Sequence, residues 1–383
     1  MRRPWQSGGR RRQHLGPRND EAAVDAGLKT RIHAQAETQW AVEAWRGIAA
    51  LLVLSTHWAP LAGGHNPLTA FAFTGVDVFF VISGYVFAPH VLGLEAQPLG
   101  PYAVRRLLRI YPAYLVALAV YALWKWQAGA PLLYLGEHVL MLHVQSREMA
   151  FYYSPPFWSL PSEVAFYAAV PVLAWMSRGR HAAWAWVGLV VLAGAARLAF
   201  VALADVQTQN MAYLLVHHLP GLLIEFLMGT WAWRQVQRRH AAGADAGRSA
   251  WPWWGLGLLL FGAATAAYWA LEHLRGSHWL HGQLSLLAAA AFALVLVGTA
   301  QAQPTGAAPR ALGWWAGRLS YGVYLLHPLW GLALAAWVPR WGPAAGLGLA
   351  ALGLAASALA LHLAVEEPMR RWGRRWAQQW ARP

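Results

Sequence analysis

The chain has 383 residues, of which 58% are hydrophobic and only 12% are charged. Soluble domains carry roughly 25% charged residues, so this chain has too little charge to cover a water-facing surface, and we predict an integral membrane protein. The net charge of +14 would suggest a nucleic-acid partner in a soluble protein. Here the arginines cluster between apolar runs, so we predict cytoplasmic loop charges and no nucleic acid.

The chain has no cysteine, which excludes disulfides and thiolate metal sites, and we predict no metal.

We predict an all-α fold, a bundle of about ten transmembrane helices. Each predicted helix is close to the roughly twenty residues that a bilayer core requires. The run 132–144 is apolar but short, so we predict that it is re-entrant or interfacial. The predicted helices, in chain order, are residues 42–62, 69–91, 107–127, 159–177, 181–203, 211–234, 252–271, 281–301, 314–338 and 342–364.

Two basic tails flank this membrane domain. Residues 1–40 lack an apolar core, so we predict a disordered basic cytoplasmic tail and no signal peptide. Residues 41–366 form the predicted transmembrane domain, and residues 367–383 form a second basic cytoplasmic tail. Most of the 30 lysines and arginines fall in the tails and in alternate connections. This bias predicts an even number of spans with both termini in the cytoplasm.

The first predicted helix contains Arg46 and His57. At about 100° per residue, their eleven-residue separation gives three turns plus roughly 20°, so both face the same way, roughly 16 Å apart along the axis. An ionisable group inside a membrane is costly and indicates a site, and a histidine can serve as a general base. The alternatives are a snorkelling anchor for Arg46 and a helix–helix hydrogen bond for His57.

The second predicted helix contains an acid, Asp77, within an apolar run. We predict that its carboxylate orients His57 by accepting the other ring proton. The alternative is a structural acceptor for the ends of neighbouring helices. Gly75, Ser83 and Gly84 allow close helix packing.

Arg106 and Arg109 lie three residues apart at the start of the third predicted helix. They are therefore neighbours on one helical face, and such a pair suits phosphate. The alternative is a positive-inside cluster that contacts lipid headgroups.

Glu163 lies near the start of the fourth predicted helix, which Ser159 or Ser162 caps. In the first turn, an acid is favoured by the helix dipole, which is the structural interpretation. The functional interpretation places Glu163 at the outer mouth of the site, where an acceptor hydroxyl arrives.

In the ninth predicted helix, Ser320, Tyr324 and His327 lie on one stripe. The alternative to a site is hydrogen bonding between helices. Three more intramembrane polar groups carry weaker functional predictions, namely His217, His218 and Glu225.

Six segments in order, from residue 42 to 371, together resemble the acyltransferase 3 family of bacterial membrane acyltransferases. The family's Arg and His separated by ten residues match Arg46 and His57, G-V-D-x-F-F-x-x-S-G-[FY] matches 75–85, R-R-x-x-R-I-x-P matches 105–112, W-S-L-x-x-E-x-x-F-Y matches 158–167, L-S-Y-x-x-Y-L-x-H-P matches 319–328 and V-E-x-P matches 365–368. The family often has two adjacent acids followed by Gln in the fourth-helix motif. Here Val164 and Ala165 follow Glu163, so any role of a second acid is absent, and Pro161 is expected to loosen the start of the helix.

The resemblance implies transfer of an acyl group, usually acetyl from acetyl-CoA, to a hydroxyl of a carbohydrate or other cell-envelope acceptor. It implies a multi-pass protein of the bacterial inner membrane, with acyl-CoA as donor substrate, membrane lipid as partner and no permanently bound cofactor. The expected catalytic residues are His57, Asp77 and Glu163, and the expected donor-binding residues are Arg46, Arg106 and Arg109. The further candidate site residues are Ser83, Trp158, Tyr324 and His327.

The sequence leaves several properties open: the acceptor, the acyl chain length, the oligomeric state, the membrane side of modification, and whether a covalent acyl-histidine forms. The competing interpretation is a transporter or exporter of a small molecule without acyl transfer. Such a protein also carries intramembrane acids and histidines, but it usually shows internal repeats and broken helices in matched halves, and none is evident here.

Overall fold

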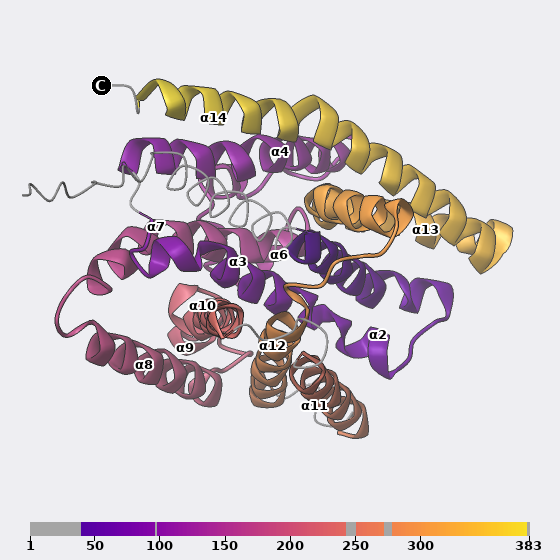
Figure 1. Ribbon diagram of the computed structural model, residues 1–383. Helices are drawn as coiled ribbons and strands as arrows, with labels where there is room; N and C mark the ends of the chain where they lie inside the picture. The colour runs from indigo at the N-terminus through magenta and orange to yellow at the C-terminus, as the bar shows by residue number, and fades with distance from the viewer. Residues whose placement is uncertain (1–39, 96–97, 243–249, 272–277, 381–383) are drawn as a thin grey trace, which may run out of the picture.

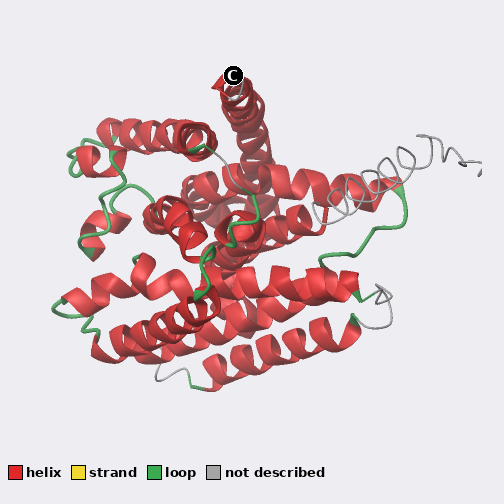
Figure 2. Ribbon diagram, turned by 60° about the vertical axis from the view of Figure 1, so that its left-hand side comes forward, coloured by secondary structure: helices red, strands yellow, loops and turns green. Residues whose placement is uncertain are grey.

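The structure, a computed structural model, describes residues 40–95, 98–242, 250–271 and 278–380. Within these ranges it contains helices and no strand (Figures 1 and 2), so the predicted all-α fold is confirmed. The predicted tail of residues 1–40 lies outside the described residues except for Trp40, which is helical. The α-helices are residues 40–58, α2 (Pro67–Phe71), α3 (Gly75–Val91), α4 (Leu99–Gln127), α5 (Leu135–Val139), α6 (Arg147–Phe151), α7 (Leu160–Met176), α8 (Ala182–Leu203), α9 (Met211–Val216), α10 (Leu219–Ala241), α11 (Trp251–Ala270), α12 (His278–Thr299), α13 (Ala307–Leu361) and α14 (Glu367–Trp380).

Seven helical segments among the described residues are long and apolar enough to cross a membrane, by length and composition alone. One of these, residues 307–380, contains both of the last two predicted helices. They are joined at Gly342, whose φ of 82° interrupts the helical backbone of α13. The protein is therefore a multi-pass membrane protein, and the count of ten spans stays a prediction.

The structure differs from the prediction at one helix. The predicted helix 211–234 is divided into α9 and α10 by a break at His217 and His218, after which α10 starts at Leu219 with Pro220 in its first turn. Proline is favoured at this position because its missing N–H has no helical partner there. The apolar run 132–144 contains only the five-residue helix α5, which is too short to cross a bilayer, in agreement with the prediction that this run does not span the membrane.

Helices α3 and α10 cross in close backbone contact at Gly84 and Gly229. A Cβ atom on Gly84 would lie 1.8 Å from the carbonyl oxygen of Phe226, and one on Gly229 would lie 1.9 Å from that of Val81. The Thr230 hydroxyl also donates to the Gly84 carbonyl over 3.2 Å. Small residues permit this approach because they remove the side chains that would separate the helices. The crossing fixes which face of α3 meets its neighbours.

Helix α14, predicted only as a basic tail, packs against α4 (Figure 1). Gly373 and Ala377 form its buried face. A short π-helical segment, His362–Glu366, joins it to α13. The close packing of α14 on α4 places Glu366 and Arg370 next to the helices that carry the candidate site.

Candidate active site

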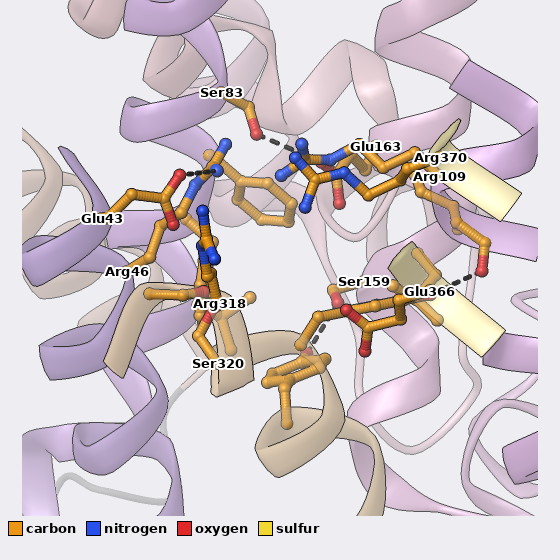
Figure 3. Close-up of a pocket in the computed structure, with 18 residues that line it drawn as sticks. Glu43, Arg46, Ser83, Arg109, Ser159, Glu163, Arg318, Ser320, Glu366 and Arg370 are labelled. Carbon is orange, nitrogen blue, oxygen red and sulfur yellow. Dashed lines mark hydrogen bonds and ion pairs between the residues drawn. The ribbon is translucent and has the colours of Figure 1, made fainter. Parts of the chain in front are cut away.

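A pocket with an empty volume of about 860 Å³ lies between the first helix, α3, α4, α7 and α13 (Figure 3). Apolar side chains such as Val76, Phe79 and Ile110 form part of its wall. Its polar and charged lining residues are Glu43, Arg46, Ser83, Arg109, Ser159, Glu163, Arg318, Ser320, Tyr321, Tyr324, Glu366 and Arg370.

Four arginines face this pocket. Among the described residues, only one of the four forms a hydrogen bond with a carboxylate of the pocket lining. Arg46 donates to Glu43 over 3.0 Å. The guanidinium of Arg109 has no hydrogen-bond acceptor among the described residues, and it repels both Arg46 and Arg370. Arg318 stacks on the Trp314 ring, 5.5 Å from its centroid. An anion that accepts from several of these groups would relieve their mutual repulsion.

Helix α7 starts at Leu160 and supplies Glu163 to the same pocket. The Ser83 hydroxyl donates to Glu163 Oε1 over 3.2 Å, and the Tyr167 hydroxyl donates to the same oxygen. The sequence predicted Glu163 at the outer mouth, whereas the structure places it in the lining with Arg46 and Arg109. Pro161 does not loosen the helix, because it lies in the first turn, where no N–H is needed.

On the side toward His327, the pocket lining stops at Tyr324, which contacts Ser159. The two hydroxyl oxygens are 2.7 Å apart, and Tyr324 donates to the carbonyl oxygen of Pro156 over 2.9 Å. The Tyr324 ring packs edge-on against Phe79, with 5.6 Å between centroids. Neither predicted serine caps α7 with its side chain, because the Ser159 hydroxyl points to this contact and the Ser162 hydroxyl donates to His217 O.

His57 lies one ring beyond this end of the pocket. The Tyr324 ring is 6.3 Å from the ring of His327, which is 5.0 Å from the ring of His57. The Nδ1 atom of His57 lies 3.3 Å from Nε2 of His327 and 2.8 Å from the carbonyl oxygen of Val53. The structure therefore brings His57, Tyr324 and His327 together, with Tyr324 in the pocket lining and the two histidines outside it.

Asp77 does not contact His57 in the described part of the chain. It is buried on the face of α3 that meets α10, where it interacts electrostatically with Arg197 and Glu225. Arg197 lies 3.5 Å from Glu225 Oε1 and donates to three backbone carbonyls. The predicted acceptor role toward His57 is thus taken by other groups, and Asp77 serves in a buried charge cluster.

Two further predicted residues lie outside the pocket lining. The guanidinium carbon of Arg106 is 4.4 Å from the Phe87 ring centroid, so this side chain stacks on aromatic rings instead of facing the pocket. Trp158 packs edge-on against His217, with 5.4 Å between ring centroids.

Sequence reasoning missed four charged lining residues, Glu43, Arg318, Glu366 and Arg370. Glu366 and Arg370 are four residues apart, and this spacing places them on one helical face. Glu366 belongs to the segment matched to V-E-x-P and Arg370 was predicted as part of the basic tail, so neither was predicted as a site residue. No group of three or more His, Asp or Glu suited to a metal occurs in the described ranges.

Comparisons with known proteins give a family and a relative. A family model described as an acyltransferase domain (Acyl_transf_3) matches residues 39–364. The chain is 31% identical over 232 residues to a Komagataeibacter xylinus protein named "Putative membrane-bound transacylase BcsY", and the alignment covers 54% of this chain and 54% of that protein. The chain thus matches about half the length of this curated relative. No solved structure matches the chain.

Proposed function

We propose, from the premise that this chain belongs to the acyltransferase 3 family, that it moves acetyl from acetyl-CoA to a hydroxyl of a carbohydrate or other envelope acceptor. Membership in this family supports a membrane acyltransferase, and the donor, acceptor and acyl group are the proposal. We place the enzyme in the bacterial inner membrane with both termini in the cytoplasm. The observation that carries the proposal is the arginine-lined pocket that ends one ring away from His57.

The arginines provide the donor site. Coenzyme A carries several phosphates, and the guanidinium group matches phosphate geometry. Arg109 supports this role best, because its N–H groups face the pocket with no described acceptor. Arg46, Arg318 and Arg370 surround the same space. The apolar walls at Val76, Phe79 and Ile110 suit the pantetheine arm, which would extend toward Tyr324.

The closed end of the pocket favours a short acyl group. Tyr324 is 4% exposed and is fixed by hydrogen bonds to Pro156 O and Ser159. A long acyl chain would have to displace this ring and Phe79, and such overpacking is costly. Acetyl needs little room, because it carries only one methyl group beyond the carbonyl carbon.

His57 acts as the general base. It takes the proton of the acceptor hydroxyl while the hydroxyl oxygen forms a bond to the thioester carbonyl carbon. The carbon–sulfur bond then breaks, and the thiolate of coenzyme A takes the proton from His57. Atoms and charges balance, and the products are the acetyl ester and free coenzyme A. In a covalent variant of this route, His57 would carry the acyl group transiently.

The test is acetyl transfer by the purified full-length protein in lipid nanodiscs. The protein receives carbon-14-labelled acetyl-CoA and an envelope glycolipid extract, and free thiol is measured with a thiol reagent. Because the chain has no cysteine, the thiol signal comes only from coenzyme A. We expect thiol release with label in the extract. A transporter without acyl transfer would release no thiol, and this outcome would contradict the proposal.

A further inference from the structure

Pro328 leaves a backbone carbonyl of α13 without its usual donor. In an α-helix, the N–H at position 328 would bond to the carbonyl oxygen of Tyr324, but proline has no N–H. Proline within a helix is tolerated when another group satisfies the freed carbonyl. Here that group is the imidazole of His327, whose Nδ1 lies 2.9 Å from Tyr324 O and 3.2 Å from Val323 O.

These two contacts determine the tautomer of His327. A carbonyl oxygen only accepts hydrogen bonds, so Nδ1 of His327 must carry the proton. In the neutral ring, Nε2 then has a lone pair and can only accept. His327 is fully buried, so a charged form without an anionic partner would be costly.

The contacts of His57 fix the position of its proton in the same way. Its Nδ1 lies between two acceptors, the Val53 carbonyl oxygen at 2.8 Å and Nε2 of His327 at 3.3 Å. Nδ1 must therefore carry the hydrogen, and Nε2 has the lone pair that a general base needs.

We propose that His327 is a positioning residue that accepts from His57 Nδ1 and so keeps His57 Nε2 as the site of proton uptake. The proposal rests on the proposed role of His57 as the general base. A second proton cannot enter at His327 Nε2, because two N–H groups would then face each other. The proton of the acceptor hydroxyl therefore goes to His57 Nε2, and the His57 Nδ1–H bond to His327 stabilises the cation. In this site a neutral histidine does what a carboxylate does in other triads.

The first test replaces the acceptor atom. We expect His327→Leu to lower kcat for thiol release from acetyl-CoA by about 10- to 100-fold, with KM for acetyl-CoA within twofold. His327→Gln supplies a side-chain oxygen as acceptor and should restore kcat to within about threefold of wild type. Equal kcat in wild type and His327→Leu would overturn the proposal, as would an equal loss in a folded His327→Gln.

The second test restores the backbone donor and leaves both histidines in place. In Pro328→Ala, the new N–H competes with His327 for Tyr324 O, so we expect kcat to fall about threefold at unchanged KM. Pro339→Ala is the matched control, because it removes another proline of α13. A kcat loss of the same size in both variants would contradict the proposal. This pair of variants also tests the positioning role of His327 if His327→Leu does not fold.

A spectroscopic measurement separates this inference from the proposed function. Nitrogen-15 NMR of protein with labelled histidine, with the spectra of His57→Gln and His327→Gln subtracted in turn, reports the tautomer of each ring at rest. We expect both rings to be protonated at Nδ1 and unprotonated at Nε2. Protonation of either ring at Nε2 would overturn the inference, even if the enzyme turns over. If wild type releases no thiol, the proposed function fails and the NMR result alone decides the tautomers.

Discussion

The hydroxyl oxygen of Tyr324 lies 2.7 Å from the Oγ of Ser159, at the point where the arginine-lined pocket ends. The tyrosine ring separates this pocket from the pair of His327 and His57. The same side chain therefore lies beside His327, the neighbour of the proposed base, and we infer that it limits the length of the acyl group.

This limit predicts a change of acyl specificity in Tyr324→Leu. Wild type should prefer acetyl-CoA over hexanoyl-CoA. The smaller side chain should raise the hexanoyl-to-acetyl ratio of kcat/KM by about tenfold, since each methylene accommodated in an apolar pocket contributes about 1–3 kcal/mol. Thiol release measures both substrates. Tyr324→Phe keeps the ring and is the matched control, and a ratio unchanged in Tyr324→Leu would contradict the length limit.

The arginines predict a graded effect on donor binding. Arg109→Gln should raise the Kd of coenzyme A by at least about tenfold, because hydrogen bonds to charged groups contribute about 1.5–3 kcal/mol. Arg106→Gln should change it by less than about threefold, because this side chain stacks on Phe87 outside the pocket lining. Isothermal titration calorimetry with coenzyme A measures both. Equal losses would show that Arg106 reaches the ligand after all.

The crossing of α3 and α10 predicts a large stability effect from one methyl group. In Gly84→Ala, the new Cβ would clash with Phe226 O, and we expect a loss of about 3 kcal/mol, at the upper end for overpacking. Gly194→Ala is the matched control, because no atom lies within 4 Å of its Cβ position. It should stabilise its helix by about 0.5–1 kcal/mol. Thermal unfolding in detergent compares the two, and equal melting temperatures would count against the tight crossing.

We predict that the protein loses stability when the buried cluster of Arg197, Glu225 and Asp77 loses its arginine. Arg197→Met leaves two buried acids and three carbonyls without their donor, so we expect a loss of about 3–5 kcal/mol. Arg180→Met changes an exposed arginine and should stay within about 0.5 kcal/mol of wild type. Chemical unfolding measures both variants, and a neutral Arg197→Met would refute a structural role for the cluster.

Local patterns predicted the parts of the molecule that depend on one helix. Every predicted helix lies over a helix of the structure, and the periodicity that placed Arg46 and His57 on one face agrees with their inward positions. The predicted role of Asp77 was wrong, because the partner of this carboxylate depends on which neighbouring helix its face of α3 meets. The contact of Gly84 with α10 decides this. Gly84 indicated close helix packing, but the sequence does not show which distant helix packs there.

The contact between the two histidines also could not be predicted from local patterns. His57 and His327 are 270 residues apart in the chain, so no spacing rule joins them. The sequence does show a proline directly after His327, and a proline at this place frees the carbonyl of Tyr324. That local feature predicts that the Tyr324 carbonyl needs another hydrogen-bond donor, which His327 supplies. The contact between His327 and His57 depends on the packing of α13 beside the first helix, which the sequence does not show.

The most direct test of the account compares thiol release from acetyl-CoA by wild type and His57→Ala in nanodiscs. We expect wild type to release coenzyme A and His57→Ala to lose at least about 100-fold in kcat, as for a missing general base. Expression, melting temperature and the Kd of coenzyme A should stay near wild type, because His57 lies outside the pocket lining. A folded His57→Ala protein with kcat within twofold of wild type would contradict the account.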